Sequence, residues 1–138
     1  MKTNKIVKII ILILWMIVIF LLSNQTGSES QNLSDTFISK TICNFINNCN
    51  PDIYSFIVRK LAHFTLYFIL GIFSVINFKN DKDGLINALI ICITYAFFDE
   101  IHQMLVGSRS GEARDVLIDS ISSLLSIILV YRIRKKRS

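Results

Sequence analysis

The sequence predicts an all-α polytopic membrane protein with four transmembrane helices in an antiparallel bundle. The chain has 138 residues, of which 52% are apolar and 18% are charged, whereas about 25% charged residues is usual for a soluble domain. The apolar residues form four long blocks instead of alternating with polar residues. A bilayer core about 30 Å thick takes roughly 20 helical residues, so each block could cross it. A chain of this length has room for a single domain over 1–138.

The first helix is expected over 6–22, after a basic start. A secretory signal peptide has the same order of a basic and an apolar segment. Here the apolar run is longer than a usual signal, and no small-x-small cleavage pattern occurs at 23–26. We therefore expect an uncleaved transmembrane helix.

The other three helices are expected over 56–78, 85–106 and 115–131. A long segment rich in Ser, Asn and Thr, residues 23–52, separates the first two helices. The run 80–84 has the composition of a tight turn, and 107–111 has that of a flexible loop. The last two apolar blocks span the membrane only if polar residues at their ends are included.

The distribution of basic residues predicts how the chain is oriented in the membrane. The net charge is +5, from 15 basic and 10 acidic residues. The two ends and the 79–84 turn share one side and hold all the basic residues except five, which are Lys40, Arg59, Lys60, Arg109 and Arg114. Basic residues collect on the cytoplasmic side of membrane proteins. We therefore expect both termini and the basic tail 132–138 in the cytoplasm, with the 23–52 segment outside. Because these flanks account for the positive charge, nucleic-acid binding is excluded as a function class.

Three cysteines occur in the chain. Cys92 lies in the third apolar block, where a thiol behaves as a small apolar side chain. Cys43 and Cys49 both lie in the segment that we expect outside. An oxidising exterior would permit a disulfide between them, and two unpaired thiols is an equally acceptable alternative.

Polar side chains interrupt all four helices at similar depth. Counted at 1.5 Å per residue from the expected cytoplasmic ends, they lie roughly 18–28 Å into the membrane. On the second helix, residues 60, 63, 67, 71 and 74 also follow helical spacing along one face. Carboxylates facing lipid are costly, so these groups must line the bundle interior or a wet cavity. The candidate site residues are Ser23, Gln25, Lys60, His63, Tyr67, Asp99, Glu100, Gln103, Arg109, Asp115 and Asp119.

These residues follow a recognisable pattern. The chain reads Arg59-Lys60-x-x-His63-Phe64-x-x-Tyr67, then Asp99-Glu100-x-x-Gln103, Arg109, and Asp115-Val116-x-x-Asp119, with Ser23 and Gln25 after the first helix. In this order the motifs resemble the VanZ-like family of small membrane proteins. The resemblance implies a multi-pass protein of the bacterial cytoplasmic membrane. It also implies a link to low-level resistance to teicoplanin, a glycopeptide antibiotic, without a defined biochemical activity.

Some positions depart from the family pattern. The family usually has Asn at the position of Asp119 and often an acid at that of Leu66, and it favours Gly where Ser122 and Ser126 stand. Serine preserves close helix packing, but Asp119 adds a negative charge to the site.

Two functions are consistent with this arrangement. The favoured one is a non-enzymatic envelope protein whose outward cavity binds a membrane lipid head group, a lipid-linked cell-wall precursor or a glycopeptide antibiotic. In it, Lys60 and Arg109 would bind phosphate or carboxylate groups. The alternative is an intramembrane enzyme acting on a lipid-linked substrate, with His63, Asp99, Glu100 and Asp115 as candidate acid–base residues. We predict no cofactor and no metal, since no metal-ligand spacing is present. A purely structural ion network is the remaining alternative.

Overall fold

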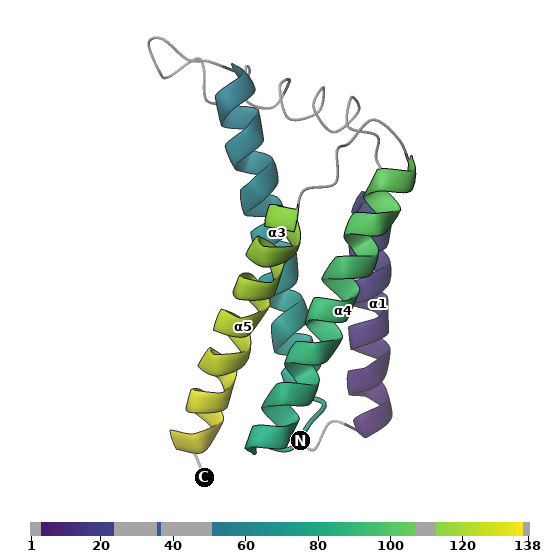
Figure 1. Ribbon diagram of the computed structural model, residues 1–138. Coiled ribbons are helices and arrows are strands. Elements are labelled where there is room, and N and C mark those ends of the chain that lie inside the picture. Colours follow the sequence, from purple (N-terminus) through teal and green to yellow (C-terminus); the bar gives the residue numbers. More distant parts are fainter. Residues whose placement is uncertain (1–3, 24–35, 37–50, 107–112, 137–138) are drawn as a thin grey trace.

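The computed structural model describes residues 4–23, 36, 51–106 and 113–136. These ranges contain four long α-helices: α1 (Lys5–Ser23), α3 (Pro51–Val75), α4 (Lys82–Val106) and α5 (Ala113–Lys136). Each is long and apolar enough to cross a membrane. The helices pack side by side, and both termini lie at the same end of the bundle (Figure 1). The predicted all-α class with four membrane spans is confirmed.

Helices α3 and α4 form the middle of the bundle. Helix α5 packs against both of them, and α1 packs against both as well. No contact joins α1 to α5 among the described residues, so the middle pair separates these two helices. We use "distal end" for the end of the bundle opposite the termini, where α1 and α4 end and α3 begins (Figure 1).

The helix bounds differ from those expected, for local reasons. Helix α3 begins at Pro51 instead of 56, because proline suits the first turn of a helix. It ends at Val75 instead of 78, where tight backbone bonds such as Phe78 N to Val75 O (3.2 Å) close the turn. Helix α4 begins at Lys82, inside the expected 80–84 turn, because Asp81 accepts a hydrogen bond from the Gly84 N–H (2.7 Å) and caps the helix.

Helix α5 continues through most of the segment expected to be a tail and ends at Lys136. Its basic last turn, Arg134 to Lys136, suits the negative end of a helix dipole. The Arg134 guanidinium also donates to the carbonyl oxygens of Val75 (3.1 Å) and Phe78 (3.2 Å). These bonds tie the last turn of α5 to the end of α3.

The most extensive helix contact is between α3 and α5, and the two helices are tightly packed at Gly71. A Cβ atom at this position would lie 2.6 Å from the Ser123 carbonyl oxygen and 3.0 Å from the Ser123 Cα. Serine hydroxyls of α5 use this proximity: Ser122 donates to Phe64 O (2.5 Å) and Ser123 to Tyr67 O (3.0 Å). Small residues and such cross-helix bonds are typical of helix packing in lipid.

Side chains at several depths attach α1 to the middle pair. The Trp15 indole N–H donates to Leu66 O (3.0 Å), and the Tyr95 hydroxyl donates to Met16 O (2.5 Å). Near the termini, Lys8 Nζ donates to Ile76 O (3.3 Å). The outer faces of the helices carry exposed apolar side chains, among them Leu14, Phe98 and Leu105. This distribution is that of a bundle whose solvent is lipid.

Candidate functional site

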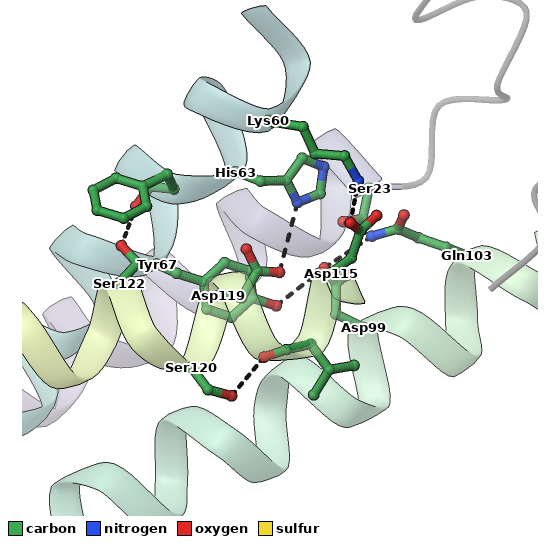
Figure 2. Close-up of polar contacts among 12 residues, drawn as sticks. Ser23, Lys60, His63, Tyr67, Asp99, Gln103, Asp115, Asp119, Ser120 and Ser122 are labelled. Atoms are coloured by element: carbon green, nitrogen blue, oxygen red, sulfur yellow. Dashed lines mark hydrogen bonds and ion pairs between the residues drawn. The ribbon is translucent and has the colours of Figure 1, made fainter. Parts of the chain in front are cut away.

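A cluster of polar side chains lies in the distal half of the bundle, and all four helices contribute to it (Figure 2). We call it the distal cluster. Its members lie within the candidate membrane spans, and five of them are at least nine-tenths buried. The distal cluster consists of Ser23 from α1, Lys60, His63 and Tyr67 from α3, Asp99 and Gln103 from α4, and Asp115 and Asp119 from α5.

The outermost pair of the cluster joins α3 to α5. Lys60 Nζ forms a hydrogen-bonded ion pair with Asp115 Oδ1. The two side chains are 25% and 27% exposed, so this pair is the part of the cluster most open to its surroundings. Asp115 lies in the first turn of α5, where the helix dipole favours a negative charge. The Lys60 charge is therefore already compensated within the protein.

One helical turn further from the distal end, His63 faces Asp119 (Figure 2). His63 Nδ1 lies 3.8 Å from Asp119 Oδ2, which is within ion-pair range but too long for a hydrogen bond. The histidine side chain is 24% exposed and that of Asp119 only 7%. The imidazole thus lies between the open part of the cluster and a buried carboxylate.

A chain of hydrogen bonds joins α3, α4 and α1 (Figure 2). The Tyr67 hydroxyl donates to Asp99 Oδ2 (3.1 Å), and Gln103 Nε2 donates to the same oxygen (3.1 Å). Gln103 Nε2 also lies 3.3 Å from Ser23 Oγ. Tyr67 is fully buried and Asp99 is 4% exposed. Asp99 is therefore held from two sides through one of its oxygens.

Three buried polar atoms of the cluster lack a hydrogen-bond partner. They are Asp99 Oδ1, Asp119 Oδ1 and His63 Nδ1. Three carboxylates thus share the cluster with one lysine and one histidine, and its acceptor capacity exceeds the donors that surround it. Among the described residues, no three His, Cys, Asp or Glu side chains are grouped as a metal site would need.

The structure brings together most of the residues that the sequence singled out. Glu100 is half-buried on α4, next in sequence to Asp99. Four of the predicted residues lie outside the described residues, namely Gln25 and Arg109 of the candidate site, and Cys43 and Cys49 of the candidate disulfide. Cys92, the remaining cysteine, is a buried free thiol as expected.

Sequence reasoning missed two features of the site. It paired His63 with Asp99 or Asp115, whereas the ion pair of His63 that the structure shows is with Asp119. It also omitted Ser123, which is fully buried and donates a hydrogen bond to the backbone carbonyl of Tyr67 on α3. Ser123 follows Asp119 by four residues, so helical spacing could have placed both on one face.

Comparison with known proteins identifies a family. A family model described as VanZ/LLP1 matches residues 8–134, which include every residue of the distal cluster. No curated protein and no solved structure matches the chain.

Proposed function

The chain belongs to the VanZ/LLP1 family, and from that premise we propose that it is an envelope protein whose distal cluster binds a polar ligand. By binding this ligand, the protein lowers the susceptibility of the cell to teicoplanin-type glycopeptides. The ligand is a lipid head group, a lipid-linked cell-wall precursor or the amphiphilic antibiotic itself. Family resemblance supplies the link to the antibiotic, and the residues of the cluster supply the binding site.

The observation that carries this proposal is the set of buried acceptors without a partner. An ionised side chain in the middle of a membrane costs about 2.5–3.5 kcal/mol on insertion scales. A network that only held the helices together would pair its polar atoms fully, as buried polar groups usually are. Asp99 and Asp119 each keep one buried oxygen unpaired. These oxygens favour a role in binding over a purely structural one.

Access to the cluster would come from the distal end. Lys60, His63 and Asp115 are each about one-quarter exposed there, whereas Asp99 and Asp119 lie deeper. Both chain ends carry basic residues, which favours their location in the cytoplasm. With the termini inside, the distal end faces outward, where cell-wall precursors and glycopeptides are found.

A second candidate is acid–base catalysis on a lipid-linked substrate. The position of His63 Nδ1 near Asp119 Oδ2 favours it, since a carboxylate beside an imidazole orients the ring and stabilises its protonated form. In this alternative Asp119 replaces Asp99 and Asp115 as the partner of the base.

The proposal predicts that Asp99→Asn abolishes protection against teicoplanin. Asparagine keeps the shape of the side chain but removes its charge. The minimum inhibitory concentration is measured in a sensitive host that expresses wild-type protein, the variant or neither. The matched control is Asp83→Asn, the same change at an exposed acid near the other end of α4.

We expect the Asp99→Asn strain to match the empty-vector strain and the Asp83→Asn strain to match the wild type. Immunoblots must show equal amounts of protein in the membrane. Full protection by Asp99→Asn at wild-type abundance would contradict the proposal.

A further inference from the structure

We infer that the distal cluster binds a protonated amine, so that its ligand presents an ammonium group to Asp99 and Asp119. This inference rests on the proposed function and deepens it by naming the chemical class of the ligand. It departs from the sequence-based expectation that Lys60 binds a phosphate or carboxylate, because Lys60 is already paired with Asp115.

The charges of the distal cluster favour a cation as its ligand. Among the ion pairs that the described residues form, Lys60 pairs with Asp115 and His63 with Asp119, whereas Asp99 is a member of neither. Once Lys60 and Asp115 neutralise each other, two carboxylates remain with one imidazole in the cluster. The side chains that hydrogen-bond to Asp99 are uncharged, namely Tyr67 on α3 and Gln103 on α4, and Gln103 contacts the uncharged Ser23 on α1. A ligand that enters the cluster therefore gains most by bringing a positive charge.

The unpaired acceptor atoms of the cluster also favour an ammonium group. Asp99 and Asp119 are 4% and 5% exposed, and each has one oxygen without a hydrogen-bond partner. Their side chains point into the cluster from α4 and α5, with His63 entering from α3 (Figure 2). His63 Nδ1, 3.8 Å from Asp119 Oδ2, becomes a third acceptor when the ring is neutral and its proton is on Nε2. A primary ammonium group has three N–H donors, so it matches this set in both charge and number.

A metal ion would fit these residues less well than an ammonium group. A bound metal ion needs several ligand atoms close together at short distance. No group of three His, Cys, Asp or Glu side chains within the described ranges meets that condition. Ammonium donors reach acceptors at hydrogen-bond distances of about 2.7–2.9 Å, which tolerates the wider spacing of this cluster.

The open side of the cluster indicates how such a ligand enters. Lys60 and His63 are partly exposed, and the same helix carries exposed apolar side chains near them, including Phe56 and Leu61. An amine attached to an apolar chain would place its chain along this face and its head in the cluster. The amine could come from an aminolipid of the membrane or from a water-soluble molecule, and the shared chemistry is the ammonium group.

Native mass spectrometry of the full chain in phosphatidylglycerol nanodiscs tests the inference. The probes are dodecylammonium, dodecyltrimethylammonium, which is charged but has no N–H donor, and neutral dodecanol. We expect dodecylammonium to bind with the highest affinity. We expect Asp119→Asn and Asp99→Asn each to weaken it by about tenfold or more, because each removes a charge-assisted hydrogen bond. Asp83→Asn serves as the matched control and should bind as the wild type does.

Two further probes identify the source of the amine. Short-chain phosphatidylethanolamine competing with dodecylammonium, with no competition by butylammonium, would identify a lipid amine. Competition by butylammonium would identify an amine that enters from water. Either result supports the inference.

Equal binding of dodecylammonium and dodecanol would overturn it, since the carboxyl groups would then hold protons instead of an amine. Unchanged dodecylammonium binding in both cluster variants would overturn it too. If either variant is not monodisperse, His63→Gln tests the same acceptor set. Loss of teicoplanin protection in Asp99→Asn without any amine binding would reject the inference and leave the proposed function standing.

Discussion

Asp99 on α4 and Asp119 on α5 are both buried, yet their partners differ. Two donors, Tyr67 and Gln103, bind the same oxygen of Asp99. Asp119 has a histidine at ion-pair distance instead. In a medium of low dielectric, the loss of one donor leaves a charge incompletely solvated. The contribution of each donor should therefore be measurable in the stability of the bundle.

Tyr67→Phe is expected to destabilise the folded protein by about 1.5–3 kcal/mol, the range for a lost hydrogen bond to a charged group. The ring stays buried, so the change removes only the hydroxyl that donates to Asp99. Equilibrium unfolding in mixed micelles measures the effect. Tyr131→Phe, at the opposite end of the bundle on α5, is the control and should leave stability unchanged. Equal stability of the two variants would show that the Tyr67 hydroxyl does not hold Asp99.

At the scale of elements, the contact between α3 and α5 is the most extensive of the bundle. Gly71 allows close packing there, and the hydroxyls of Ser122 and Ser123 donate to the carbonyls of Phe64 and Tyr67, which precede Gly71 on α3 by about two turns and one turn. The same contact fixes the relative position of His63 on α3 and Asp119 on α5. Packing in the middle of the bundle therefore sets the geometry of the distal cluster.

Gly71→Ala is expected to destabilise the protein by about 1–3 kcal/mol, the usual cost of overpacking. Alanine favours helix over glycine by up to about 1 kcal/mol, so helix propensity alone predicts the opposite sign. A Cβ at this position would meet the backbone of Ser123 and the side chain of Ser126. Thermal unfolding, monitored by circular dichroism, shows whether the variant is less or more stable than the wild type.

The double variant with Ser126→Gly refines this test. It removes the side-chain obstacle but keeps the Ser123 backbone, so it should recover only part of the lost stability. A more stable Gly71→Ala protein would mean that α3 and α5 lie further apart than in the structure.

At the scale of the whole molecule, the number of helices was predictable because each span needs a long apolar block, and such blocks are visible in sequence. The members of the distal cluster were predictable from depth and helical spacing, as with His63, Tyr67 and Asp99. Which of these side chains pair with one another was not predictable from the sequence. Whether His63 meets Asp99 or Asp119 depends on the rotation and crossing of α3, α4 and α5, which helical spacing within one segment does not determine. Helix ends such as Lys82 depended on a capping contact of Asp81 that the composition of the turn obscured.

The proposed orientation predicts that a cysteine introduced as Ser138→Cys is shielded from impermeant thiol reagents in intact cells. The native cysteines are first replaced. Basic residues at both ends favour a cytoplasmic location for that position. Labelling should require permeabilised cells. Labelling in intact cells would show that the chain has the opposite orientation.

The central claim is that a negatively charged cluster inside the membrane opens to the outside, and the reactivity of His63→Cys in intact cells tests it most directly. The account predicts reaction with an impermeant, positively charged methanethiosulfonate added outside, faster than with its negatively charged analogue. The control is Thr65→Cys, two residues further on the same helix and on an exposed face that we expect to contact lipid; it should react with neither. Reaction of His63→Cys only after permeabilisation, or a preference for the negative reagent, would contradict the account.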